Sequence, residues 1–257
     1  MKIRLSIYPL TLILVLLFTL ASCEHRPPFK ADEFINTVYQ SDPTLGVTED
    51  MGAEYIDSLI FIGESTTYHM KDRAVLSGGK NTHQIWMPKS GTMTLDAGVA
   101  KQKILYPETG ELISFSDAAA RSRPKIIIMT FGLNGAPANI RLGEDYFKSC
   151  YKRLISAISS ASPESKIILQ SAPPIAKSMD MKSYTVDVST LSGYIDKINS
   201  WTRSLCEELG LKYLNSSEVL KDSEGFLIPE FDAGDGHHLT KAAYETMLLY
   251  IRTHGYR

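Results

Sequence analysis

Three side chains in this sequence have the types and the spacing needed for nucleophilic acyl transfer. Ser65 follows the apolar run at residues 58–62, and Asp235 stands three residues before His238 near the C-terminus. Serine is a weak nucleophile at neutral pH, so it needs a neighbouring base, and that base needs a partner to orient its ring. We therefore predict Ser65 as the nucleophile, His238 as the base and Asp235 as the carboxylate that holds it.

The C-terminal segment leaves two alternatives open. His237 is adjacent to His238, but the residue three positions before it is a glycine and not a carboxylate. Asp232 is another possible partner, six residues before His238. A different interpretation makes this segment a polar loop that caps the last helix. In that case Ser65 would be an ordinary N-terminal helix cap, a position that serine favours.

These residues lie in four short blocks that resemble the SGNH/GDSL-type hydrolase family. The resemblance spans roughly residues 55–252 and implies a flavodoxin-like SGNH hydrolase fold, with the hydrolase domain at 55–257. It also implies an oxyanion hole formed by the Ser65 N–H, the Gly91 N–H and the Asn134 amide. The blocks are Ile62–Thr66, Lys89–Thr92, Thr130–Gly135 and Asp235–Leu239.

The resemblance implies a serine-dependent ester hydrolase that forms an acyl-enzyme and uses no cofactor. Its substrate would be an O-acyl or O-acetyl ester on an envelope glycan or another glycan, an expectation that rests on analogy. Two alternatives remain: an O-acyltransferase that acts on a sugar, and a non-catalytic SGNH-like surface lipoprotein that binds glycan. The second is kept open by Glu64 and Gly135, which stand where the family usually has aspartate.

Short apolar runs alternate with helical patterns along the chain. Five strands are predicted, near residues 59–62, 84–87, 125–131, 166–170 and 212–214. Helical periodicity follows from Phe147 to Ile158, from Leu191 to Leu209 and after Thr240. Such alternation predicts a three-layer α/β/α fold around a mostly parallel five-stranded sheet. Ser65, Gly91 and Asn134 each follow a predicted strand, so all three should meet at the carboxyl edge of the sheet.

The N-terminal residues have the features of a lipoprotein signal peptide at 1–22. A short basic region precedes an apolar run at residues 11–20, which ends in Leu20-Ala21-Ser22-Cys23. Cys23 is the predicted lipidation site, which would anchor an exported protein to the bacterial cell envelope. The alternative is a plain signal peptide with a chance cysteine. Residues 23–54 read as a tether because prolines interrupt any regular element.

The net charge and the remaining histidines and cysteines indicate which classes of partner and ligand to expect. The formal net charge is −2, and nucleic-acid binding normally needs a basic surface. We expect an ester substrate, a membrane contact through the N-terminal lipid and no nucleic acid. His69 and His83 lack metal-ligand spacing, so no metal is predicted. Cys150 and Cys206 could pair in an exported protein, but two buried free thiols are favoured.

Overall fold

The computed structural model describes residues 42–256, and the account below concerns that part of the chain. Its main sheet has four parallel strands in the order β1-β4-β5-β6. Three of them, β1, β4 and β5, are short runs rich in isoleucine and other apolar residues, as expected for strands covered on both faces. Four of the predicted strands are thereby confirmed: β1 (Leu59–Gly63), β4 (Ile126–Thr130), β5 (Lys166–Gln170) and β6 (Lys212–Leu214).

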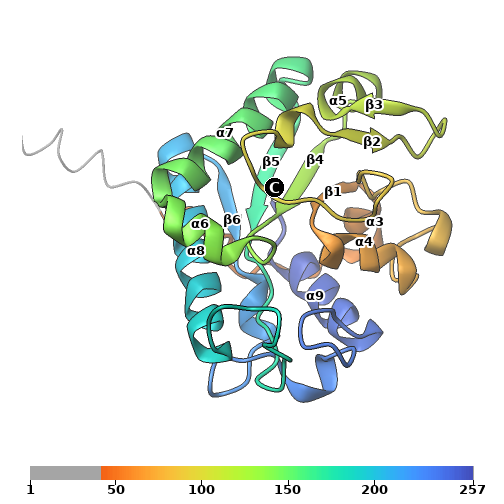
Figure 1. Cartoon of the computed structure of the whole chain (residues 1–257). Coiled ribbons are helices and arrows are strands. Elements are labelled where there is room, and N and C mark those ends of the chain that lie inside the picture. The colour runs from red at the N-terminus through yellow and green to blue at the C-terminus, as the bar shows by residue number, and fades with distance from the viewer. Residues whose placement is uncertain (1–41, 257) are drawn as a thin grey trace, which may run out of the picture. The chain divides into compact units, whose positions relative to one another are not determined.

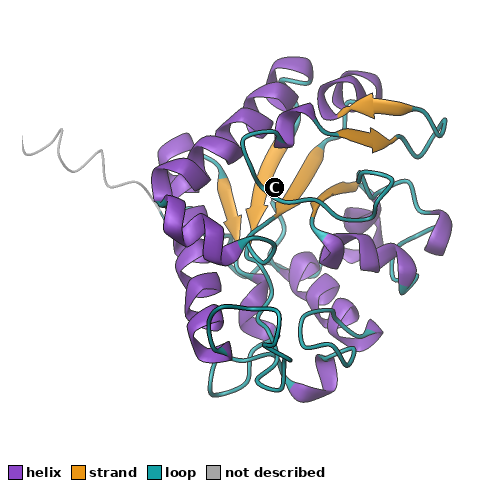
Figure 2. Ribbon diagram, viewed as in Figure 1, coloured by secondary structure: helices purple, strands orange, loops and turns teal. Residues whose placement is uncertain are grey.

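Helices cover both faces of this sheet, which confirms the three-layer α/β/α fold (Figures 1 and 2). On one face lie α5 (Phe115–Ser122), α6 (Ala136–Leu142), α7 (Glu144–Ala161) and α8 (Val188–Leu209). On the other lie α3 (Gly52–Asp57), α4 (Ser65–Asp72) and α9 (Lys241–Thr253). Short 3-10 turns span Gly79–Asn81, Val99–Lys101, Ser216–Val219 and Pro229–Phe231.

The predicted five-stranded sheet is corrected to four strands. The segment at 84–87 lies where the fifth strand was expected, beside β1, but it makes a single parallel bridge between Ile85 and Phe61. Two backbone hydrogen bonds join it to Phe61, and the next residue after the segment is Pro88. Proline has no N–H to extend a ladder, so the pairing stops there.

The sequence analysis also missed an antiparallel hairpin outside the main sheet. It pairs β2 (Lys103–Leu105) with β3 (Leu112–Ser114). Each strand has three residues, too few to show a clear alternation of polar and apolar side chains. Ser114 then caps α5 through a reciprocal pair of hydrogen bonds with Asp117, the capping-box arrangement.

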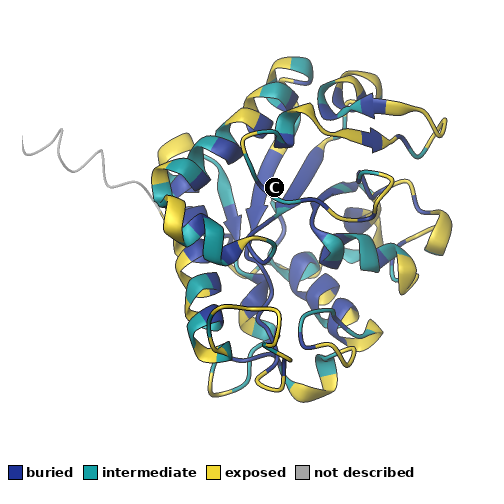
Figure 3. Ribbon diagram, in the orientation of Figure 1, coloured by how far each residue is buried: buried dark blue, intermediate teal, exposed yellow. Residues whose placement is uncertain are grey.

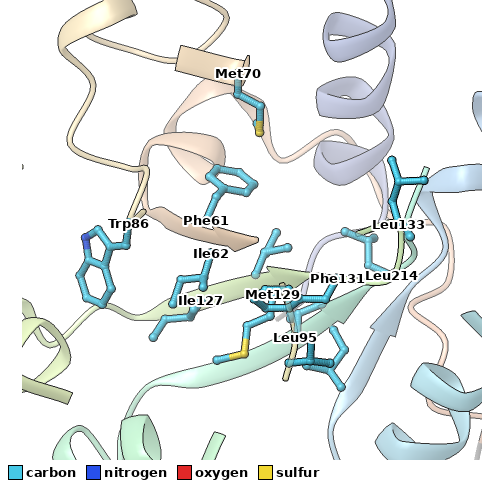
Figure 4. Close-up of a cluster of buried hydrophobic side chains, with 14 of the residues drawn as sticks. Phe61, Ile62, Met70, Trp86, Leu95, Ile127, Met129, Phe131, Leu133 and Leu214 are labelled. Carbon is cyan, nitrogen blue, oxygen red and sulfur yellow. The ribbon is translucent and has the colours of Figure 1, made fainter. Parts of the chain in front are cut away.

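The core fills the space between the sheet and its two helical layers. The strands β4 and β5 are buried along nearly their whole length (Figure 3). Phe61, Ile127 and Met129 extend from β1 and β4, and Trp86 and Leu95 reach the same apolar cluster from the loops that follow β1 (Figure 4). This packing fixes the ends of the strands, and therefore the loops that carry the site.

The folded unit begins earlier than the predicted domain start at residue 55. Residues 42–54, expected to belong to the tether, pack on the domain: Thr44 bridges Tyr213 in parallel, and Asp50 pairs with Arg252. The proposed signal peptide, Cys23 and the rest of the tether lie outside the described residues. Within 42–256, no helix combines the length and the apolar character needed to cross a membrane.

Candidate active site

The turn after β1 places Ser65 at the carboxyl edge of the sheet. Gly63 ends the strand, Glu64 is extended, and Ser65 is the first residue of α4. A side chain at Gly63 would meet the Thr67 hydroxyl at 2.2 Å and the Thr130 carbonyl at 2.6 Å. Only glycine fits this close approach of β1, β4 and α4. As the first helical residue, Ser65 also has an N–H with no carbonyl partner in the helix.

Ser65, His238 and Asp235 form one continuous hydrogen-bonded chain. The Ser65 hydroxyl lies 2.9 Å from His238 Nε2, and His238 Nδ1 lies 2.7 Å from Asp235 Oδ2. The serine comes from the loop after β1 and the other two from the loop before α9, 173 positions along the chain. His237 instead directs its Nδ1 to the Asp235 carbonyl oxygen, at 3.2 Å. The structure thus brings together the three residues that the spacing singled out.

Asp235 is held as a carboxylate by the loop it belongs to. Burial alone would raise its pKa, but hydrogen bonds from the His238 ring and from the backbone N–H groups of His238 and His237 bring that pKa well below its ordinary value. The carboxylate is therefore ionised across the physiological range and accepts a hydrogen bond from Nδ1 of the ring. This fixes the tautomer that leaves Nε2 free to accept from Ser65.

Asp232, the other candidate carboxylate, binds the backbone of its own loop. Its Oδ1 accepts from the backbone N–H groups of Gly234 and Gly236, each at 2.9 Å, and so shapes the loop that presents His238. Gly236 has φ +85°, and a Cβ there would lie 2.5 Å from that of Met179. The loop is thus pressed against residue 179 at a point where only glycine fits.

Glu64 holds the loop after β4 against the end of β1. Its buried carboxylate accepts three backbone hydrogen bonds of 3.0 Å, from Gly132, Leu133 and Asn134. Burial raises the pKa of Glu64 to about 7, with the three N–H donors opposing that rise. In the sequence, Glu64 was a departure from the family's usual aspartate that kept the non-catalytic alternative open. The contacts show it as the link between the first and third blocks.

The remaining oxyanion candidates lie close together but have internal partners. The Asn134 side-chain amide donates to the Thr92 hydroxyl and the Met93 carbonyl, both at 3.0 Å. The Gly91 N–H donates to the Pro88 carbonyl at 3.0 Å. Asn134 therefore ties the third block to the second, and Gly91 closes a turn. Among the three candidates, the Ser65 N–H is the one with no protein acceptor in the described chain.

His69 is a member of the site that sequence reasoning left aside. Its ring stacks on that of His238, with centroids 4.1 Å apart and planes at 26°. Its Nδ1 is buried without a hydrogen-bond partner in the described chain. Burial, and then the charge of His238, lower the pKa of His69, so the neutral ring is favoured. Residue 69 is four positions after Ser65 on a helix, and that spacing could have predicted a shared face.

Comparison with known families agrees with this geometry. The family model described as "GDSL-like Lipase/Acylhydrolase family" matches residues 61–246, which is most of the chain. The chain belongs to this family. It is a serine ester hydrolase with the SGNH fold. No curated protein matches this GDSL-like hydrolase in sequence.

Solved structures share the fold of this GDSL-like hydrolase at low sequence identity. A GDSL-like lipase from Bacteroides thetaiotaomicron is 16% identical, with a TM-score of 0.52 over 76% of this chain and 85% of its own. A proposed acylhydrolase from Bacteroides fragilis is also 16% identical, with a TM-score of 0.52 over 76% of this chain and 84% of its own. A structure described as a proposed platelet activating factor from Streptococcus pneumonia is 17% identical, with a TM-score of 0.52 over 86% of this chain and 90% of its own.

Several side chains near the site or able to react as nucleophiles are buried in the core of the hydrolase. Trp86 is fully buried in the core, and Met93 is nearly so. Cys150 and Cys206 are buried free thiols, and burial raises the pKa of Cys206 to about 12. Such a thiol is a poor nucleophile at neutral pH.

Donor atoms of Asp235, His237 and His238 lie within 4.8 Å of one another, close enough for a metal ion. Both ring nitrogens of His238 are already hydrogen-bonded, however, to Asp235 and to Ser65. The assembled triad therefore leaves no nitrogen of that ring for a metal.

Proposed function

We propose that this hydrolase removes small O-acyl groups, such as acetyl, from a glycan through an acyl-enzyme on Ser65. The observation that carries the proposal is the hydrogen-bonded chain from Asp235 through His238 to Ser65, with links of 2.7 and 2.9 Å. Both distances are normal for strong hydrogen bonds. A proton can thus pass from the serine hydroxyl to the imidazole without rearrangement of the site.

In the first half-reaction the Ser65 oxygen attacks the ester carbonyl carbon, and its proton moves to His238 Nε2. Asp235 stabilises the imidazolium that forms and holds the ring in place. The tetrahedral intermediate then expels the alcohol, which takes the proton from Nε2. The products of this half-reaction are the free hydroxyl of the glycan and an acyl group esterified to Ser65.

In the second half-reaction water attacks the acyl-enzyme, and His238 Nε2 takes a proton from that water. Collapse of the second tetrahedral intermediate returns the proton to the Ser65 oxygen and releases the acid. The imidazole of His238 is neutral again at the end of the cycle, so no cofactor is consumed.

Charge on the carbonyl oxygen needs donors that point at its tetrahedral position. The Ser65 N–H, at the start of α4, is one such donor. Asn134 would supply a second by exchanging its bond to the Thr92 hydroxyl for one to the oxyanion; Thr92 is exposed, so water can replace the lost bond. Gly91 would join them only if its turn with Pro88 opened.

Support for a glycan substrate comes from the N-terminal sequence and from analogy within the family. The segment Leu20-Ala21-Ser22-Cys23 predicts export and lipid attachment, which would bring the enzyme to the surface polysaccharides of the envelope. Transfer of the acyl group to a sugar hydroxyl uses the same first half-reaction and differs only in the acceptor. The assembled triad argues against the glycan-binding alternative without turnover.

The test uses the full chain in detergent, with p-nitrophenyl acetate and an O-acetylated glycan as substrates. We expect acetate release from both, and fluorophosphonate labelling at Ser65. Ser65→Ala should abolish the labelling and reduce hydrolysis by at least about a thousandfold. Labelling without turnover on any ester would contradict the esterase proposal. Acetylated sugar product, followed by mass spectrometry with a free sugar present, would instead identify transfer.

A further inference from the structure

A hollow of about 370 Å³ opens beside α4 and is distinct from the residues of the triad. It lies between the segment at 81–89 and the hairpin turn at 105–110. Ile85 and Met87, both buried, belong to its lining, which gives the hollow an apolar part. Its volume falls in the range of small-molecule binding pockets. We call it the basic hollow, for the side chains described next.

The polar lining of the basic hollow has one sign of charge. Lys71 of α4 and Lys89 contribute ammonium groups, and His83 contributes an imidazole. No aspartate or glutamate lines it, and within residues 42–256 neither lysine makes an ion pair. Two unpaired cations in one recess create a positive potential that attracts anions.

Two carboxylates next to the basic hollow have partners of their own, and the exposed Glu108 of the hairpin turn is not part of the lining. Asp72 follows Lys71 on α4, but its Oδ2 lies 4.0 Å from His69 Nε2. Glu111, next to the hairpin turn, pairs with Arg121 of α5. The positive charge of the basic hollow is therefore available to a ligand.

The basic hollow shares a wall with the catalytic site. Tyr68 lines it, and this residue lies three positions after Ser65, which places both on one side of α4 about one helical turn apart. The Tyr68 ring also packs on Gly91, where an added Cβ would lie 3.2 Å from it. Pro88, another lining residue, accepts the hydrogen bond from Gly91. A substrate with its ester carbonyl at Ser65 would therefore extend along Tyr68 toward the basic hollow.

We infer that the basic hollow binds an anionic group, a carboxylate or a phosphate, carried by the ester substrate near its scissile bond. This inference rests on the proposed ester hydrolysis at Ser65, and it adds a substrate class: acidic esters, such as those of glycans with uronic acid, lactyl or phosphate substituents. Lys71 and Lys89 are the specificity-determining residues, and the apolar part of the lining accommodates the uncharged remainder of the group.

The test compares two rigid esters that differ only in charge, 4-acetoxybenzoate and its neutral analogue 4-acetoxybenzamide. The native full chain should favour the anionic ester in kcat/KM by about tenfold or more, mainly through a lower KM, since a charge-assisted contact is worth about 1.5–3 kcal/mol. Lys71→Met with Lys89→Met keeps the apolar stems and removes both charges, so the preference should fall to about one. Lys241→Met, an exposed lysine of α9 outside the basic hollow, is the matched control and should keep the preference.

The outcomes distinguish a failure of the proposed ester hydrolysis from a failure of the proposed anion site. Hydrolysis of neither ester by the native chain would count against the proposed esterase, whereas equal hydrolysis of both would overturn the basic hollow as an anion site. An anion preference that survives the double lysine substitution would also overturn it. Competitive inhibition by benzoate or by inorganic phosphate, lost in the double variant, then distinguishes a carboxylate from a phosphate ligand.

Discussion

At the scale of single residues, the site depends on which of two neighbouring imidazoles reaches the serine. His238 is hydrogen-bonded on both sides, to Ser65 and to Asp235, whereas the His237 ring contacts the backbone carbonyl of Asp235. The base must lie within hydrogen-bond reach of the proton it removes. The geometry therefore assigns different chemical roles to two adjacent residues of the same type.

His238→Ala should lower kcat for ester hydrolysis by about three or more orders of magnitude, as expected for loss of a triad base. His237→Ala should cost less than about tenfold, and Asp235→Asn should fall between them because the ring remains but loses its partner. Steady-state kinetics on p-nitrophenyl acetate measure all three, with circular dichroism to establish that each variant is folded. An inactive His237→Ala together with an active His238→Ala would show that the base is misassigned.

His69 should act as a positioning residue for the imidazolium of His238. A neutral aromatic ring at 4.1 Å offers a π face to the charge that forms during catalysis, and it restrains the ring. His69→Phe keeps the stack and should keep kcat within about threefold. His69→Lys puts a fixed positive charge beside His238 and should lower kcat by about tenfold or more, because like charges disfavour the charged form of the ring.

The pH dependence of kcat/KM tests whether a charge at position 69 acts on His238. With lysine at position 69, the acid limb of kcat/KM should move to lower pH, because a fixed positive charge disfavours the neighbouring imidazolium. Asp235 contacts the His238 ring in every variant and favours its charged form, so the native protein and both variants are compared at equal ionic strength. An unchanged acid limb in His69→Lys would mean that a charge at position 69 does not act on the His238 ring.

At the scale of elements, the start of α4 and the loop after β4 are coupled through one buried side chain. Glu64 precedes α4 and binds the N–H groups of three successive residues after β4, including that of Asn134. The family usually has the shorter aspartate at this position.

Glu64 should make stability depend on pH with a defined sign. Its pKa is raised from an ordinary 4.5 to about 7 in the folded chain, mainly by burial. Below pH 4.5 it is protonated in both states. As pH rises from 4.5 to 7, only the unfolded chain loses the proton, so the contribution of Glu64 to the free energy of unfolding falls, by about 3 kcal/mol.

Urea denaturation of native protein and Glu64→Gln at several pH values between 4.5 and 8 measures this effect. The native-minus-variant difference in unfolding free energy should decline with rising pH and level off above about 7. A difference that grows with pH would show that the three N–H donors, and not burial, dominate the ionisation of this carboxyl group.

At the scale of the whole molecule, the enzyme should be held at a membrane by its N-terminus. This prediction rests on the segment that ends in Cys23, outside the described residues. Cys23→Ser should release the protein from the membrane fraction or block its processing. Fractionation and intact-mass measurement test it, with Cys150→Ser as a control that leaves the signal untouched. Unchanged fractionation and N-terminal mass in Cys23→Ser would rule out lipid anchoring.

The sequence by itself determined the four main strands, the long helices and the identity of the hydrogen-bonded triad. Apolar runs and three- to four-residue periodicity are local signals, and parallel strands bring the residues after them to one edge. Asp235 and His238 could be paired in advance because they are only three positions apart, whereas Ser65 was joined to them through the family resemblance. The boundary at residue 55 was less accurate, because the segment at 42–54 packs on the domain without any periodic pattern.

Only the tertiary structure decided the contacts between segments far apart in the chain. The carboxylate of Glu64 meets N–H groups 68 to 70 positions away, the His69 ring meets His238, and Lys71 and Lys89 share one hollow. Such contacts depend on how helices and loops pack around the sheet. Sequence spacing does not encode that packing. Neither the contacts of Glu64 with the loop after β4 nor the charge of the basic hollow could therefore be predicted from it.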